Sequence, residues 1–312
     1  MNKMKKRYLK TTILILLFLF IFSVSSQAGQ VITNDVKVWA QKALEEEGTL
    51  KAPIGRNTLA VLYFLNKTDR PELNPVQKGL ALMLTTDLST VKGIQVIERV
   101  KLQALVEEMG LGTSGLVEPD TAPRVGKLLG AERLVGGNIS AGQQAQILQI
   151  QSTLLDVPSQ EIRGQPMVKG NLSNLFILEK DLLFEIIKLL QIELKPEERE
   201  RLRRPCSTNM SALMALFNGI EESDKGEYEK AAGFYELGLK EDPNICIAHD
   251  ALKELKALGL IASKRSRSTL QSIREQTSLT DQLSPEDANK RERTPKDVQT
   301  PTTPTDIIIH FP

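Results

Sequence analysis

The chain has very few residues of the types that build metal sites and catalytic triads. Its 312 residues include only two histidines and two cysteines, His249, His310, Cys206 and Cys246. With only two residues of each type, spread along the chain, a structural zinc site or a disulfide-stapled mini-fold is largely excluded. We therefore expect no metal, no cofactor and no enzymatic activity.

The chain also lacks an excess of charge of either sign. Its 40 Lys and Arg residues are balanced by 39 Asp and Glu residues, which leaves a formal charge of +1. Without a net positive field, nucleic acid is not an expected partner. The composition, 41% hydrophobic and 25% charged, is that of a globular protein of one or two domains.

Long apolar runs are absent except at the start of the chain. A lysine-rich beginning precedes an apolar run from Ile13 to Phe22, and Ser26-Gln27-Ala28 supplies the small residues of a cleavage site. This pattern predicts a signal peptide over residues 1–28. The alternative is an uncleaved anchor, although ten apolar residues are short against the roughly 20 that span a membrane. We expect a periplasmic protein with peripheral or no membrane contact, or one associated with the outer membrane.

Hydrophobic periodicity predicts an α/β domain over residues 29–194. Dense apolar runs at 58–65, 94–98 and 133–140 indicate strands, whereas 146–157 alternates like a strand with one wet face, and 165–170 adds a further strand. Helices are expected at 34–47, 75–91, 100–109, 120–129 and 175–194. After the first helix, the predicted order is β-α-β-α-α-β-β-β-α, with a parallel start and a later antiparallel hairpin in one mixed sheet.

Beyond residue 194 the composition changes three times. Residues 195–206 form a charged connector, and residues 207–261 are patterned as helices. Residues 262–305 are rich in Ser, Thr, Pro and mixed charge, which predicts a disordered tail. Residues 306–312 restore apolar side chains.

The helical part resembles a single tetratricopeptide repeat followed by a capping helix. Small, aromatic and proline residues stand in the repeat's register, at Gly219, Gly226, Tyr228, Ala231, Tyr235 and Pro243. The sequence departs from the repeat's pattern at Glu222 and Gly238. The resemblance implies an α-hairpin that packs on the preceding domain or on another copy, because about three repeats are needed for an autonomous solenoid.

The α/β part resembles the CsgG/HfaB family, which is named for the curli secretion channel. The residues that carry this resemblance are AVLYFLNKT (60–68), KGLALMLTTDLS (78–89), the long block from VIERV to GGNIS (96–140) and LLDV (154–157). The resemblance implies an envelope protein that works by assembly with protein partners and as a homo-oligomer.

Two functions remain open. The curli channel resembles a lipoprotein that carries a lipid-bearing cysteine and two membrane-crossing hairpins, and this sequence lacks both features. Their absence favours an exported, non-catalytic scaffold or accessory protein of an envelope assembly or secretion system. The alternative is an oligomeric curli-type secretion channel component of the outer membrane. Gly110, Gly112 and Gly115 match a dinucleotide fingerprint, but a helix precedes them, so they are expected to end that helix.

Two further features predict contacts. Cys206 and Cys246 both lie near helix starts, and an exported compartment permits a disulfide between them, although the sequence fixes no distance. The β-prone segment with Ile307, Ile308, Ile309 and Phe311 is either a strand that docks on an open sheet edge or a disordered end.

Overall fold

The computed structural model describes residues 30–49, 57–112, 121–142 and 147–262. The predicted signal peptide, most of the tail and the C-terminal segment lie outside the described residues. The strands are β1 (Thr58–Asn66), β2 (Gln95–Val96), β3 (Arg133–Ala141), β4 (Ile147–Asp156), β5 (Glu161–Gly164) and β6 (Met167–Asn171). The helices are α2 (Asn34–Glu45), α3 (Asn74–Ser89), α4 (Arg99–Glu108), α5 (Thr121–Leu129), α6 (Leu175–Leu189), α7 (Pro196–Arg203), α8 (Met210–Asp224), α9 (Tyr228–Glu241) and α10 (Ala248–Ala257).

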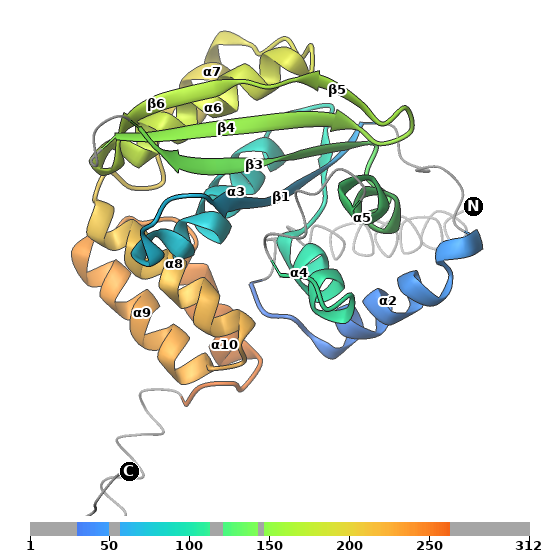
Figure 1. Cartoon of the computed structure of the whole chain (residues 1–312). Coiled ribbons are helices and arrows are strands. Elements are labelled where there is room, and N and C mark those ends of the chain that lie inside the picture. Colours follow the sequence, from blue (N-terminus) through green and yellow to red (C-terminus); the bar gives the residue numbers. More distant parts are fainter. Residues whose placement is uncertain (1–29, 50–56, 113–120, 143–146, 263–312) are drawn as a thin grey trace, which may run out of the picture. The chain divides into compact units, whose positions relative to one another are not determined.

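The strands form one mixed sheet in the order β2-β1-β3-β4-β5, with β6 also paired to β4 (Figure 1). Strand β1 is parallel to both β2 and β3, whereas β4 runs antiparallel to β3, β5 and β6. The α/β class and the combination of a parallel start with a later antiparallel hairpin, both expected from the sequence, are thereby confirmed.

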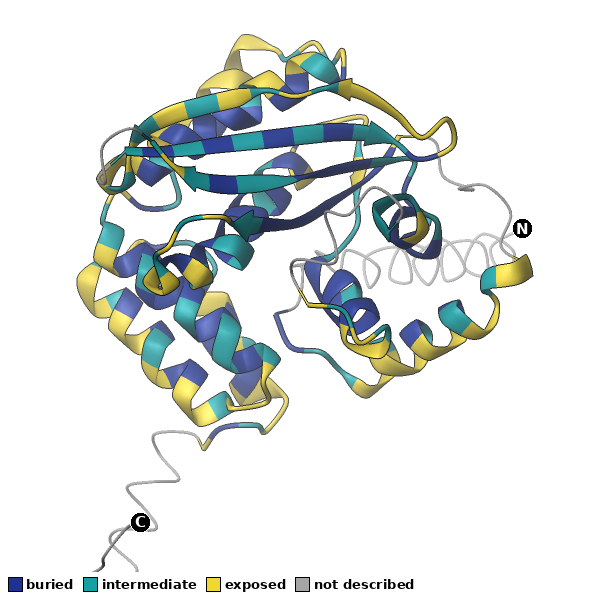
Figure 2. Cartoon of the chain, in the orientation of Figure 1, coloured by how far each residue is buried: buried dark blue, intermediate teal, exposed yellow. Residues whose placement is uncertain are grey.

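Helices cover the two faces of the sheet unequally. Helices α3 and α6 contact each other and pack on β1, β4 and β6, while α4 and α5 cover β1 and β3 from the other face, with α2 outside them. Strand β1 is accordingly buried along most of its length (Figure 2). On β4 the residues Leu148, Ile150 and Leu154 are buried, whereas Gln149 and Gln151 on the opposite face are half-buried. The predicted wet face of this strand is therefore present.

The antiparallel edge has one strand more than the sequence suggested. The run predicted at 165–170 is β6, and β5 pairs with β4 just before it. Pro166, which has no N–H to donate, separates the two strands. Strand β5 is short and mostly exposed, so it carries no alternation of apolar and polar residues that would have revealed it.

A helix lies within the region expected to be only a charged connector. Helix α7 has Pro196 at its first position, Glu197 and Glu198 in its first turn, and Arg201 and Arg203 in its last turn. This order of charges matches the helix dipole. The Arg199 and Arg203 guanidinium groups lie 5.3 and 5.6 Å from the Phe184 ring centre, which attaches α7 to α6.

Candidate functional site

The helical hairpin is held together by a close contact between α8 and α9. Gly219 on α8 faces the ring of Tyr235 on α9, where a Cβ atom would lie 2.4 Å from the ring. Tyr235 and Ala231 are both fully buried. Gly219 and Tyr235, both expected to contribute to repeat packing, therefore meet between α8 and α9, and Ala231 lies one helical turn before Tyr235 on α9.

The other residues selected for the repeat lie at its ends. Gly226 adopts a φ of +76° in the turn between α8 and α9, a conformation that glycine adopts without steric cost. Tyr228 begins α9 and packs partly buried against the core, whereas Pro243 is exposed just after α9.

The hairpin packs directly on the α/β part through α3. Phe217 on α8 is fully buried, and its ring lies against Gly79 of α3, where a Cβ atom would be only 2.3 Å away. The position therefore leaves no room for a larger residue. The apolar face that a single repeat would leave uncovered is in this way covered by α3.

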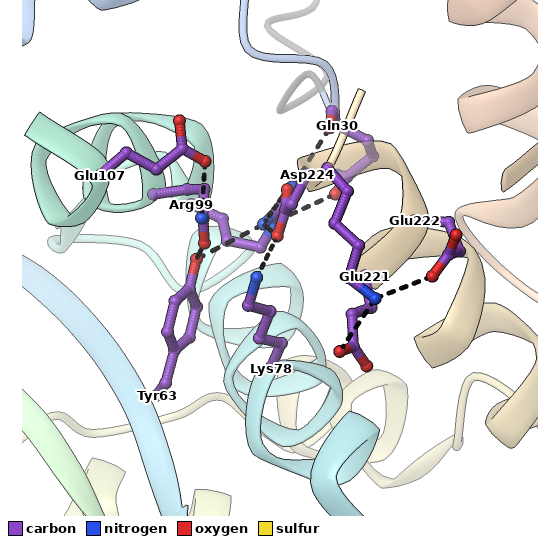
Figure 3. A network of polar contacts seen from close by, with 10 residues as sticks. Gln30, Tyr63, Lys78, Arg99, Glu107, Glu221, Glu222 and Asp224 are labelled. Atoms are coloured by element: carbon purple, nitrogen blue, oxygen red, sulfur yellow. Dashed lines mark hydrogen bonds and ion pairs between the residues drawn. The ribbon is translucent and has the colours of Figure 1, made fainter. Parts of the chain in front are cut away.

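A buried ion pair lies at the junction of these helices (Figure 3). Arg99, at the start of α4, donates through Nη1 to both carboxylate oxygens of Asp224 at 3.0 Å. Lys78 on α3 donates to the same carboxylate at 2.7 Å. The Arg99 and Asp224 side chains are only 1% and 2% exposed. Burial opposes the charge of Arg99, but the charge and hydrogen bond of Asp224, together with the nearby Tyr63 and Tyr235 hydroxyls, more than offset this, so the pKa of Arg99 lies above its ordinary value.

The ion pair extends into a larger polar network. Arg99 also donates through Nη2 to the backbone oxygen of Gln30 at 3.1 Å, and its Nη1 lies 3.4 Å from Tyr63 Oη. Tyr63 on β1 donates to Gln103 Oε1 at 2.6 Å. Burial, as the main cause, raises the pKa of the Tyr63 hydroxyl. We call Gln30, Tyr63, Lys78, Arg99, Gln103 and Asp224 the junction network.

Helix α10, which follows the hairpin, binds the backbone of Gln30 and Val31, where the junction network starts in the sequence. The Glu254 carboxylate on α10 accepts hydrogen bonds from the backbone N–H groups of Gln30, at 2.7 Å, and Val31, at 3.3 Å. Contacts of the junction network thus join β1, α3, α4, α8 and α10. Buried polar groups that are mutually paired in this way are suited to fixing an arrangement of elements.

A second charged cluster lies between α3 and α6. Lys180 contacts Asp87, and its Nζ lies 3.2 Å from Glu179 Oε2. Glu179 is fully buried. Burial first, and the nearby charge of Asp87 second, raise the pKa of Glu179 well above the ordinary value, while Lys180 acts in the opposite direction.

A disulfide joins Cys206, before α8, to Cys246, before α10, with the two Cα atoms 5.2 Å apart. The bond closes a loop with a sequence separation of 40. By the loop-entropy relation, such a loop contributes about 4 kcal/mol to stability. The disulfide therefore fixes the end of the hairpin at which α10 begins.

A groove with a volume of about 730 Å³ lies between the edge strand β2, the end of α3 and one face of α10. Its lining is mixed, with apolar side chains such as Val96, Ile97 and Ala251 beside threonine, serine and charged residues.

The remaining candidate residues that the structure describes lie apart from one another. Among the described residues, no three His, Cys, Asp or Glu side chains gather as a metal site would require. His249 is exposed on α10. Gly110 ends α4 with a φ of +64°, as expected, while Gly115 lies outside the described residues. No helix within the described ranges is both long and apolar enough to cross a membrane.

The junction network has almost no signal in the sequence. Arg99 and Asp224 are 125 positions apart, and each stands in a segment where charged residues are ordinary. The only local signal is an arginine at the start of a helix, where the helix dipole disfavours a positive charge.

Comparison with known proteins gives one family match. The model of the family described as "Curli production assembly/transport component CsgG" matches residues 40–146, about a third of the chain. The matched range runs from within α2 to the residue before β4 and includes Tyr63, Lys78, Arg99 and Gln103 of the junction network. No curated protein matches the chain.

Several solved structures show a weak likeness. The C-terminal domain of LpoB from Salmonella enterica is 18% identical, with a TM-score of 0.32, and covers 44% of this chain and 95% of its own. The lipoprotein GNA1162 from Neisseria meningitidis is 13% identical, with a TM-score of 0.33, and covers 45% of this chain and 100% of its own. At such low scores we infer nothing about function from these structures. From the family match, the chain is similar to the CsgG family over residues 40–146, which include the parallel strands of its sheet.

Proposed function

We propose that this protein is an exported, non-catalytic accessory or scaffold protein of a bacterial envelope assembly or secretion system. The observation that carries the proposal is the match of residues 40–146 to the CsgG family model. That range covers the parallel strands and the helices on them, which form the frame of the α/β part.

The geometry of the polar clusters supports a scaffold. Arg99 and Asp224 are buried, and their hydrogen-bonding groups face one another and their neighbours in the junction network. Such an arrangement holds the α/β part and the helical hairpin in one position. Two further features add to this rigidity: the hydrogen bonds from Gln30 and Val31 to Glu254 on α10, and the disulfide between Cys206 and Cys246.

Export is part of the proposal. The signal peptide over residues 1–28 supplies the route, and a disulfide between Cys206 and Cys246 suits the oxidising periplasm. We also propose that α8 and α9 are a tetratricopeptide-type pair. The close contact of Gly219 with Tyr235 supports this assignment. Protein partners, among them a second copy of the chain, then bind its exposed surfaces.

Fractionation of a bacterial host that expresses the full chain tests this function. We expect the processed protein in the periplasmic fraction, or in the envelope fraction with release by carbonate in the absence of detergent. Recovery in the cytoplasm would contradict the proposal. Release only by detergent would favour the alternative, a secretion channel component of the outer membrane.

A further inference from the structure

The groove beside β2 is bounded on one side by an open sheet edge. Strand β2 stands at the end of the sheet order, so among the described strands only β1 is its neighbour. The N–H groups of Gln95 and Ile97 donate to the backbone oxygens of Asn57 and Leu59, at 3.0 and 2.8 Å. Because successive residues of a strand point their backbone groups to opposite sides, the N–H and C=O of Val96 face away from β1, and Val96 lines the groove.

The opposite wall of the groove is helical. Residues of α10, among them Ala251 and Ala257, lie across from the strand edge. A groove between an edge strand and a helix is the arrangement in which extended peptides add to a sheet, because the strand supplies backbone hydrogen bonds and the helix supplies side-chain contacts.

The same wall contains one residue with a strained backbone. Ile247, which lines the groove beside Cys246, has a φ of +66° and a ψ of −45°. The Ala248 N–H donates to the Cys246 oxygen at 2.6 Å, which makes Ile247 the centre of a γ-turn with positive φ. Such a conformation is costly for a β-branched residue, and strained residues of this kind gather at binding sites.

We propose that this groove is the docking site of the chain's own C-terminal segment, Ile307–Phe311, which adds to β2 as a further strand. The described chain ends at Ala262, five residues after α10, so the remaining residues leave from the helix that lines the groove. A coil of the 45 residues from Ala262 to Asp306 has a root-mean-square span of roughly 34–40 Å, which is enough to reach back to the groove.

The chemistry of the segment fits an added strand. Three consecutive isoleucines and Phe311 have high β-propensity, and alternate side chains of a strand point to the same side. Five extended residues span about 17 Å. Pro312 has no N–H, so the pairing ends with the chain.

Amide exchange of the full chain and of a chain that ends at Thr305 tests the proposal. The N–H of Val96 is protected in the full chain, and removal of residues 306–312 speeds its exchange at least tenfold while β4 is unchanged. Equal exchange at Val96 in both proteins overturns the proposal. Faster exchange at β6 instead of β2 does the same, because it places the segment at the opposite edge.

A synthetic peptide of residues 305–312 supplies the second arm. Added to the shortened chain, it restores protection at Val96, whereas a peptide that carries Ile308→Pro does not. Failure of the unmodified peptide to restore protection at millimolar concentration contradicts the proposal. If the protection of Val96 in the full chain does not change with protein concentration, the segment docks on its own chain. If the protection rises with protein concentration, the segment docks on a neighbouring copy. Both results support the docking site.

Two variants and a control locate the peptide. Val96→Pro removes the N–H that faces the groove and leaves the hydrogen bonds of Gln95 and Ile97 to β1 in place, so it abolishes peptide binding. Lys169→Pro is the matched control, because Lys169 faces outward from β6 at the opposite edge and its replacement leaves binding intact. Ala257→Arg, at an exposed position of α10, fills the groove without a change in the sheet and weakens binding at least tenfold. Unchanged binding by Val96→Pro or Ala257→Arg overturns the proposal.

Discussion

Glu179 is a carboxyl group whose burial makes the stability of the protein depend on pH. Its pKa is raised in the folded state by burial and by Asp87, above the ordinary value of 4.5 that it takes when the chain unfolds. The stability that this group contributes is therefore complete below pH 4.5 and declines as the pH rises through the window between the two values. The slope is at most about 1.4 kcal/mol for each pH unit.

Glu179→Gln removes this dependence. We predict that the free energy of unfolding of the variant, relative to that of the unchanged protein, increases between pH 4.5 and pH 8. Chemical denaturation at several pH values measures it. Glu185→Gln on the exposed side of the same helix is the control and shows no such trend. Parallel stability curves for Glu179→Gln and the unchanged protein would show that the carboxyl group is not perturbed.

The Arg99–Asp224 pair gives a second prediction at the scale of single residues. Asp224→Ala leaves a buried guanidinium without its carboxylate, and we expect a loss of about 3–5 kcal/mol. The double variant Arg99→Met with Asp224→Ala costs clearly less than the sum of the two single changes, with a coupling of at least about 2 kcal/mol. Urea denaturation of the four proteins measures this cycle.

The pair Arg124–Glu47 is the control for the cycle. Its atoms approach to 2.6 Å, but the two side chains are 50% and 30% exposed, so we expect a coupling below about 1 kcal/mol. Equal coupling for the two pairs would contradict the role that we assign to burial in the junction network.

The packing of α8 on α3 determines how the hairpin is attached. Gly79→Ala places a methyl group within 2.3 Å of the Phe217 ring, and we predict a loss of about 1–3 kcal/mol despite the better helix propensity of alanine. Gly233→Ala, on α9 with no atom nearby, is the matched control and gains about 0.5–1 kcal/mol. Thermal denaturation compares them. An equal gain in both variants would mean that α8 does not approach α3 as closely as described.

The sequence predicted elements whose signals are local and missed those whose signals are not. Strands β1, β3 and β4 are long apolar or alternating runs, and α3 begins near a proline, so their positions agree with the expected ranges to within a few residues. Strand β2 has two residues where five were expected, because only Gln95 and Val96 pair with β1. Helix α7 differs from the expected connector, because a short charged segment with one proline has no apolar periodicity that would indicate a helix.

The candidate site was predictable only where it follows a repeat pattern. Gly219, Ala231 and Tyr235 stand at a spacing that resembles a known α-hairpin, and Gly219 lies against the Tyr235 ring in the structure. Gly79 and Phe217 were not predictable, because their contact joins two helices that are far apart in the sequence. The junction network depends on the same long-range packing, which one sequence does not specify.

At the scale of the whole molecule, the proposed function is that of a rigid scaffold that presents surfaces to other proteins. Large apolar side chains remain exposed at widely separated places, with Val38 on α2 at 53%, Ile162 on β5 at 57% and Leu237 on α9 at 44%. Scattered apolar side chains are ordinary on a protein surface, so a direct measurement is needed to identify those that meet a partner.

Site-specific photo-cross-linking in living cells is that measurement. A photoreactive amino acid replaces Val38, Ile162 or Leu237 in turn, and Lys188, a highly exposed position on α6, serves as the polar control. The account predicts a discrete adduct with an envelope protein or with a second copy of the chain from at least one apolar position, at a yield above that of the control. If the exported, folded protein gives no adduct above the control at any position, its action as a protein-binding scaffold is contradicted.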